Sequence, residues 1–219
     1  TTEEYRICVG RLVRALRQLR AGAANLVMVT SPRPGEGKSF SALNIAASIA
    51  LNGVSDVVLV DCDGKPGSLS ARFDLKDRPG LYDLAKNPSQ PPSRLALRTE
   101  IDGLLFLPVG TIATDGKTGI TTPLLTTLER VAQAYPHHVV ILDTPPCLST
   151  SDPSTLAQIA DLVVMIVQSE RTQRSEIESA IELLQHCPHI MLLLNQMRLH
   201  SSASFGHYSY YGYPNGQPS

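Results

Sequence analysis

The chain has 219 residues, 42% of them hydrophobic, so it is long enough to bury one sizeable core and requires no second domain. Nineteen basic residues nearly cancel twenty acidic ones, and the net charge of -1 excludes a global basic field for binding nucleic acid or anionic lipid. The four cysteines form no C-x-x-C pair, which argues against a zinc site and against a disulfide framework.

The chain holds no apolar run of the ~20 residues that a membrane span needs. It begins with Thr1 rather than Met, which is compatible with a fragment cut from a longer protein that does carry a span. The sequence alone leaves that question open.

The first segment predicts an amphipathic, strongly basic helix within residues 1–22. Apolar side chains recur at helical spacing, and arginines fill much of the remaining circumference. Two interpretations stay open: a solvated basic face on a packed helix, or a contact with another subunit or a membrane. The apolar set is Ile7, Val9, Leu12, Val13, Leu16 and Leu19, and the basic set is Arg6, Arg11, Arg14, Arg17 and Arg20.

After this helix, short apolar runs alternate with helical segments. Near-continuous apolar strands separated by helices predict an α/β fold, in which a mostly parallel sheet is covered by helices on both faces as an αβα sandwich. Ligands of such sheets bind beyond the carboxyl ends of the strands. We expect strands at 26–30, 57–61, 104–109, 139–143, 162–167 and 190–195, and helices at 38–52, 81–86, 120–134, 152–160 and 173–186.

Two segments lack such patterns. Residues 87–93 contain three prolines, which predicts an exposed loop without helix or central strand. Residues 199–219 are rich in Ser, His, Tyr, Gly and Pro and poor in aliphatic side chains, which predicts a flexible tail. We therefore divide the chain into a catalytic domain at 1–198 and a tail at 199–219.

Residues 31–39, Ser-Pro-Arg-Pro-Gly-Glu-Gly-Lys-Ser, follow the first predicted strand and open a helix, the context in which a phosphate-binding P-loop occurs. Gly35 and Gly37 allow backbone N–H groups to turn around phosphate oxygens. The helix N-terminus adds partial positive charge, Lys38 reaches the β and γ phosphates, and the Ser39 hydroxyl suits Mg²⁺. The first glycine of the usual G-x-x-x-x-G-K-[ST] pattern is a proline here. The alternative is a glycine-rich turn with a chance Gly-Lys-Ser.

Two later strands each end in a carboxylate, Asp61 with nearby Asp63 in one and Asp143 in the other. Such positions hold the water shell of Mg²⁺ in P-loop enzymes, and buried strand ends seldom carry aspartate without a partner. The alternative is that all three aspartates cap turns. We expect ATP and Mg²⁺ as ligands, with the nucleotide contacted by Gly35, Glu36, Gly37, Lys38, Ser39 and Phe40.

Three of these motifs and a terminal tyrosine cluster together resemble the bacterial tyrosine kinases (BY-kinases) that drive capsule and exopolysaccharide production. The motifs are Pro-Gly-Glu-Gly-Lys-Ser at 34–39, Val-Asp-Cys-Asp at 60–63 and Asp-Thr-Pro-Pro at 143–146. They are shared in part with the MinD and ParA class of P-loop NTPases, so the tyrosine cluster is the feature that distinguishes BY-kinases from that class. The cluster comprises Tyr208, Tyr210, Tyr211 and Tyr213.

The resemblance, which covers almost the whole chain, implies a role for each matching residue. Lys38 binds phosphate, Asp63 helps to bind or activate the incoming tyrosine, and Asn195 contacts adenine. The Mg²⁺ ion is organised by Ser39, Asp61 and Asp143. Since tyrosine and aspartate have pKa values near ~10 and ~4 in water, we assign Asp63 mainly orientation and late proton acceptance.

The chain also departs from the family pattern. Lys65 stands where the family usually has arginine, and the N-terminal Glu-x-x-Arg-x-x-Arg motif for oligomerisation survives only as Glu3 and Arg6, followed by Val9. The Asn-Pro-x-Glu-Leu-Leu segment becomes Thr-Pro-Leu-Leu-Thr at 122–126. These departures weaken the case for ring assembly of the family's kind.

The resulting hypothesis is an ATP-dependent autokinase that phosphorylates its own tyrosine cluster, in trans by family likeness. A flexible chain from Leu199 to Tyr210 spans roughly 20 Å, which allows either cis or trans transfer. The implied partners are a transmembrane adapter or polysaccharide co-polymerase, fused or separate, other copies of the chain in a ring or dimer, and a protein tyrosine phosphatase. We expect no nucleic acid partner and a cytoplasmic location at the inner face of the membrane.

Two other functions remain as alternatives. One is a MinD-like or ParA-like switch ATPase without kinase activity, in which nucleotide drives dimerisation and the tail is incidental. The other is a catalytically silent assembly partner of a polysaccharide export machine. A sticky aromatic end without acceptor function is the alternative interpretation of the tyrosine cluster.

Overall fold

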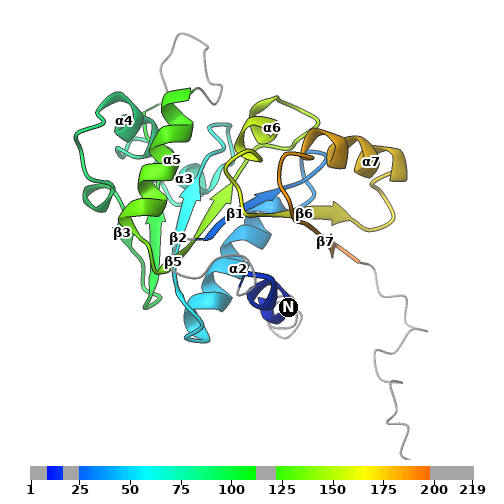
Figure 1. Ribbon diagram of the computed structural model, residues 1–219, viewed down its shortest axis with the longest axis horizontal. Coiled ribbons are helices and arrows are strands. Elements are labelled where there is room, and N and C mark those ends of the chain that lie inside the picture. Colours follow the sequence, from blue (N-terminus) through cyan, green and yellow to red (C-terminus); the bar gives the residue numbers. More distant parts are fainter. Residues whose placement is uncertain (1–8, 17–24, 112–121, 198–219) are drawn as a thin grey trace, which may run out of the picture.

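The computed structural model describes residues 9–16, 25–111 and 122–197. Within these residues the strands form a seven-stranded sheet in the order β3-β4-β2-β5-β1-β6-β7 (Figure 1). Every neighbouring pair is parallel except β3 and β4, which are antiparallel. The strands are β1 (Asn25–Thr30), β2 (Asp56–Asp61), β3 (Leu97–Arg98), β4 (Leu104–Leu107), β5 (His138–Asp143), β6 (Leu162–Gln168) and β7 (Ile190–Asn195).

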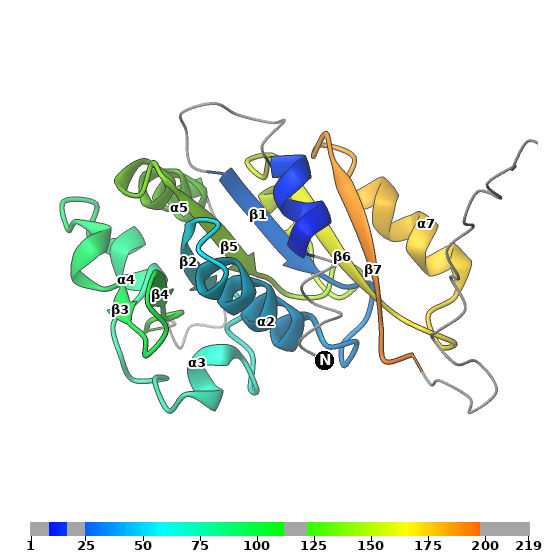
Figure 2. The same ribbon diagram turned by 90° about the horizontal axis from the view of Figure 1, so that it is seen from below.

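Helices cover both faces of this sheet (Figures 1 and 2), which confirms the predicted αβα sandwich. One face packs against α2 and the helical residues 9–16, and the other packs against α4, α5, α6 and α7. The helices are α2 (Lys38–Leu51), α3 (Leu69–Arg72), α4 (Leu81–Lys86), α5 (Thr122–Ala134), α6 (Asp152–Leu156) and α7 (Arg174–Leu183), with a 3-10 helix η1 (Pro92–Arg94).

The two cores follow from strand alternation, because successive side chains of a strand point to opposite faces. Val57 and Leu59 of β2 lie in the core beneath α2, whereas Val58 and Val60 lie in the core beneath the helices of the other face. All four side chains are buried, so the strand is apolar throughout, as expected for a parallel sheet covered twice.

The N-terminal helix matches its predicted pattern where the structure describes it, at residues 9–16. Val9, Leu12 and Leu16 are buried in the core beneath α2, while Arg11 and Arg14 are exposed. Among the described residues no helix has the length and apolarity needed to cross a membrane.

Several predicted boundaries were wrong. The strand expected at 104–109 ends at Leu107, because Pro108 has no N–H for the ladder and the next N–H, of Val109, donates to Ser70 Oγ at 2.9 Å. The segment 87–93 is not wholly loop: Pro92 is buried and begins η1, where its missing N–H costs nothing.

The predicted helix at 152–160 ends as α-helix at Leu156, and the helix at 173–186 spans Arg174–Leu183. The helix predicted at 120–134 is α5, whose first described residue is Thr122. No pattern in the sequence predicted α3, η1 or the short strand β3.

Candidate nucleotide and phosphoryl-transfer site

The predicted site residues gather where the strands end, at one edge of the sheet. Asp61 ends β2 and Asp143 ends β5, and the two residues are paired in the register of these adjacent strands. Val29 of β1 pairs with Asp143 on the other side, so the turn that follows β1 at Thr30 emerges next to both carboxylates. The topology thus places the P-loop and the two acidic strand ends together.

The P-loop backbone has the conformation that its glycines were expected to permit. Gly35 and Gly37 have positive φ angles of 85° and 92°. Gly37 is also the N-cap of α2, and a Cβ there would collide with the side-chain amide of Asn195. Glycine is therefore required at this position both by the backbone angle and by the close approach of β7.

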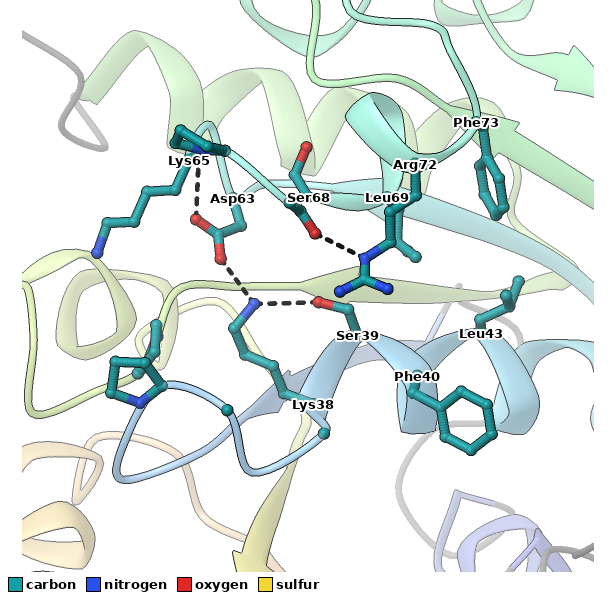
Figure 3. A pocket seen from close by; sticks show the side chains of 16 residues that line it. Lys38, Ser39, Phe40, Leu43, Asp63, Lys65, Ser68, Leu69, Arg72 and Phe73 are labelled. Atoms are coloured by element: carbon teal, nitrogen blue, oxygen red, sulfur yellow. Dashed lines mark hydrogen bonds and ion pairs between the residues drawn. The ribbon is translucent and has the colours of Figure 1, made fainter.

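The Lys38 side chain lies at the centre of the site (Figure 3). Its ammonium donates a hydrogen bond of 2.6 Å to Asp63 Oδ2 and one of 3.2 Å to Ser39 Oγ, and it lies 3.6 Å from Asp143 Oδ1. The lysine is thus held among the residues predicted to bind phosphate, metal ion and acceptor. An ammonium so placed is positioned to receive the negative charge of a phosphate.

Asp143 is fully buried, and neither of its carboxylate oxygens accepts a hydrogen bond from the residues that the structure describes. Burial raises the pKa of Asp143 to about 7, against the opposing effect of the nearby Lys38 ammonium and Ser39 hydroxyl. A buried carboxylate without hydrogen-bond donors is costly unless a cation compensates it. Its oxygens therefore fit a divalent metal ion, for which Ser39 beside it offers a further oxygen ligand.

Asp61 is also fully buried, but both of its oxygens are engaged. Oδ1 accepts the N–H of Asp63 at 3.0 Å, and Oδ2 accepts the N–H of Ser70 at 2.6 Å. Burial raises its pKa, and the hydrogen bonds from Ser70 oppose this rise. Asp61 thereby fixes the start of the segment that carries Asp63 over Lys38.

A cavity of about 360 Å³ opens between the P-loop and α3. Its polar end is formed by Lys38, Ser39 and Asp63. Figure 3 shows Leu69 and Phe73 towards the opposite end, with the guanidinium of Arg72 between them and Ser39, so apolar side chains and charged groups line one space.

The other predicted residues occupy different positions around this cavity. Phe40 lines it and is 55% exposed. Asn195, expected to contact adenine, donates its amide to the Glu36 carbonyl oxygen at 2.8 Å. The acceptor cluster at 208–213 lies outside the described residues.

Further residues, which no sequence pattern predicted, contact the P-loop from the β6 and β7 side. Thr172 donates a hydrogen bond to the buried carboxylate of Glu36, and Glu176 forms an ion pair with Arg33. They could have been suspected only from their place in the chain. They follow the end of the parallel strand β6, and the ends of parallel strands meet at the same edge of the sheet.

Curated relatives cover most of the chain, although no family model matches it. EpsB of Ralstonia solanacearum, named as a putative tyrosine-protein kinase, is 34% identical over 80% of this chain. Only 24% of the length of EpsB is spanned by this chain. Tyrosine-protein kinase YwqD of Bacillus subtilis is 30% identical, and the matched region covers 83% of this chain and 76% of YwqD. The chain belongs to the bacterial tyrosine-protein kinase family.

Solved structures agree with this membership. The kinase domain of VpsO is 29% identical with a TM-score of 0.64, over 77% of this chain and 84% of that domain. MinD of Aquifex aeolicus is 19% identical with a TM-score of 0.61, over 80% and 70% of the two chains, which shows a shared fold alone. The chain therefore has the P-loop NTPase fold that was predicted, a fold that implies nucleotide binding.

Proposed function

We propose that this chain is the catalytic domain of an ATP-dependent protein-tyrosine kinase that phosphorylates its own cluster of Tyr208, Tyr210, Tyr211 and Tyr213, in trans between copies. The observation that carries the proposal is the position of Lys38, whose ammonium lies between the carboxylates of Asp63 and Asp143 at the mouth of the P-loop. Membership of the tyrosine-protein kinase family supports the same activity.

The proposed reaction forms a bond between the tyrosine oxygen and the γ phosphorus of ATP and breaks the bond to the β,γ-bridging oxygen, so that ADP leaves. Because the transition state is loose, positioning and charge neutralisation dominate catalysis. Lys38 and the P-loop N–H groups hold the phosphates. Asp63 orients the phenol and accepts its proton late in the transfer.

Mg²⁺ would be held by Asp143 and Ser39, with Asp61 beside them, and it supplies charge neutralisation on the phosphates. The observation that supports this assignment is that the buried oxygens of Asp143 accept no hydrogen bond from the described residues. Since Lys38 is hydrogen-bonded to Asp63, phosphate binding requires the ammonium to exchange a carboxylate for phosphate oxygens.

The apolar end of the cavity favours a tyrosine acceptor over water. Leu43, Leu69 and Phe73 line the cavity beyond Lys38, next to the guanidinium of Arg72, whereas a hydrolase needs only room for a water molecule there. A phenol ring buries apolar surface and presents its hydroxyl at one end, which matches a cavity with one apolar and one charged end.

The wider role that we propose is regulation of exopolysaccharide or capsule synthesis and export. A transmembrane adapter, fused or separate, would place the domain at the inner face of the membrane, and a protein tyrosine phosphatase would reverse the modification.

Each phosphate adds about -1.5 to -2 charge at neutral pH, so a fully modified cluster carries roughly -6 to -8. The negative charge of the phosphorylated cluster would repel it from the aspartate-lined site and weaken the association between copies of the chain. If phosphorylated and phosphatase-treated protein show the same oligomer size in light scattering at low salt, this switch is wrong.

Incubation with Mg-ATP followed by mass spectrometry of the C-terminal peptide tests the kinase function. We expect phosphotyrosine within residues 208–213 in the wild type and none in Lys38→Met. The exposed Lys76→Met is the matched control and should be phosphorylated normally. ATP hydrolysis without modification of the peptide would instead identify a switch ATPase of the MinD kind. Absence of ATP-dependent thermal stabilisation would favour a silent assembly partner.

A further inference from the structure

Three side chains from outside the P-loop motif donate hydrogen bonds to the P-loop, and the proposed phosphoryl transfer uses none of them. In both views the turn between β1 and α2 lies beside the loop that joins β6 to α7 and beside the end of β7 (Figures 1 and 2). From these two segments, Thr172, Asn195 and Gln196 donate side-chain hydrogen bonds to the P-loop. We call these three residues the P-loop support.

Two of these hydrogen bonds fix the direction of P-loop peptide groups. Gln196 Nε2 donates to the Gly35 carbonyl oxygen at 3.0 Å, and Asn195 Nδ2 donates to that of Glu36 at 2.8 Å. In a planar trans peptide the C=O and the following N–H point in opposite directions. Holding these two carbonyls toward β7 therefore turns the N–H groups of Glu36 and Gly37 away from β7, into the concave side of the loop.

The third hydrogen bond, from Thr172, fixes the Glu36 side chain. Its Oε2 accepts the N–H of Arg33 at 2.9 Å, which closes the loop on itself, and its Oε1 accepts the hydroxyl of Thr172. The Thr172 oxygen in turn accepts the N–H of Gln168 at 3.2 Å, so its single proton is directed to Glu36. Glu36 is only 2% exposed, and a buried carboxylate is held in place strongly when its donors are oriented.

Gln196 also has a backbone conformation that is uncommon for its residue type. Its φ angle is 56°, in the left-handed region. The residue is exposed, so packing of its side chain in the core does not explain this angle. A non-glycine residue in this region carries a conformational cost, and such residues concentrate at functional positions. Here the conformation directs the side-chain amide to the P-loop.

We propose that Thr172, Asn195 and Gln196 are positioning residues that preorganise the P-loop N–H groups for phosphate before the nucleotide binds. They act through the loop and do not touch the reacting atoms. The inference rests on the proposed nucleotide site. It adds hydrogen bonds to the P-loop from residues that follow or end β6 and β7 and that lie outside the P-loop motif. Preorganised donors bind an anion without the cost of ordering the loop at the moment of binding.

The test uses Thr172→Val, which removes the hydroxyl at constant shape, with Thr172→Ser as the conservative rescue. A second variant, Gln196→Gly, removes the amide and also relieves the left-handed backbone. Thr155→Val is the matched control, because its hydroxyl bonds only within its own helical turn, to the Ser151 carbonyl oxygen at 3.4 Å.

We expect faster amide hydrogen exchange at residues 33–38 of the nucleotide-free protein in Thr172→Val and Gln196→Gly, with wild-type exchange in Thr172→Ser and Thr155→Val. Calorimetry should show Mg-ATP binding about tenfold weaker in the two impaired variants, since a hydrogen bond to a charged or preorganised group is worth about that factor. At saturating Mg-ATP their phosphorylation rates should approach the wild-type rate, and Gln196→Gly should melt no lower than the wild type.

Unchanged exchange at residues 33–38 in both variants would overturn the positioning role, even if nucleotide binding were weakened. Lower melting of Gln196→Gly together with exchange raised over the whole chain would also overturn it, because the side chain would then only stabilise the fold. If the wild type itself bound no Mg-ATP, the proposed function would fail, and the exchange measurement would still decide the positioning role by itself.

Discussion

Lys38 Nζ and Asp63 Oδ2 lie 2.6 Å apart, although the two residues are 25 positions apart in the chain. The cation proposed to bind phosphate is therefore neutralised by the carboxylate proposed to orient the acceptor. In the proposed mechanism, nucleotide binding would separate this pair and free Asp63 for the tyrosine at the same moment. The ion pair would thus make acceptor activation dependent on nucleotide occupancy.

Asp63→Asn is expected to lower the rate of tyrosine phosphorylation about 100-fold while leaving Mg-ATP affinity within about threefold of the wild type. The amide cannot accept the phenol proton, but it no longer competes with phosphate for Lys38. Quench-flow phosphorylation and calorimetry measure the two quantities. A loss of affinity equal to the loss of rate would place Asp63 in nucleotide binding instead.

Asp143→Asn should change how stability depends on pH. Because burial raises the native pKa of Asp143 from 3.8 to about 7, the native state keeps a proton that the unfolded state loses between these values. This group therefore lowers the free energy of unfolding as pH rises from about 4 to about 7, by up to ~4 kcal/mol. Below pH ~4 both states are protonated and the effect is absent.

Urea unfolding of nucleotide-free protein at a series of pH values measures this effect. The stability of Asp143→Asn relative to the wild type should rise through the window from about pH 4 to about pH 7 and then level off. Parallel stability profiles for the two proteins would show that Asp143 is not responsible. The variant should also lose Mg-dependent nucleotide binding.

Gly37→Ala is expected to abolish detectable Mg-ATP binding. The added Cβ meets the Asn195 amide and displaces it from the Glu36 carbonyl, and the φ angle of 92° is unfavourable for alanine. Gly53→Ala is the control, since Gly53 has a φ of 61° but a Cβ there would meet nothing within 4 Å. Both variants should lose ~1 kcal/mol of stability from backbone strain, and only Gly37→Ala should lose the nucleotide.

Ser39→Ala should raise the Mg²⁺ concentration needed for half-maximal phosphorylation about tenfold, because it removes an oxygen ligand beside Asp143. Ser39→Thr keeps the hydroxyl and should behave as the wild type. Chelation of the metal ion should abolish activity in all three proteins. Equal Mg²⁺ requirements for Ser39→Ala and the wild type would exclude the hydroxyl from the metal site.

The sequence predicted the parts of the fold that depend on local pattern. The strands ending at Asp61 and Asp143 are apolar runs closed by a carboxylate, and both were located correctly. The helix α3 was missed because it has only four residues and depends on its cap, in which Ser68 Oγ accepts the N–H of Ala71. The strand β3 was missed because its two residues are defined only by pairing with β4.

The site was likewise predictable only where a local motif encodes it. Lys38, Ser39, Asp63 and Asp143 were identified from motifs, and the structure brings them together around one ammonium group. The contact between Glu36 and Thr172 joins residues 136 positions apart and depends on the order of strands in the sheet, which no local pattern encodes.

Gln196, which is bonded to Gly35, is also the residue from which the chain continues towards Tyr208. About a dozen residues of sequence therefore join the proposed acceptor cluster to the proposed catalytic edge. In an assembly of copies, as the proposed trans transfer requires, each cluster would lie within reach of a neighbouring site, and a competing protein substrate would have to offer higher affinity or arrive after the cluster is modified.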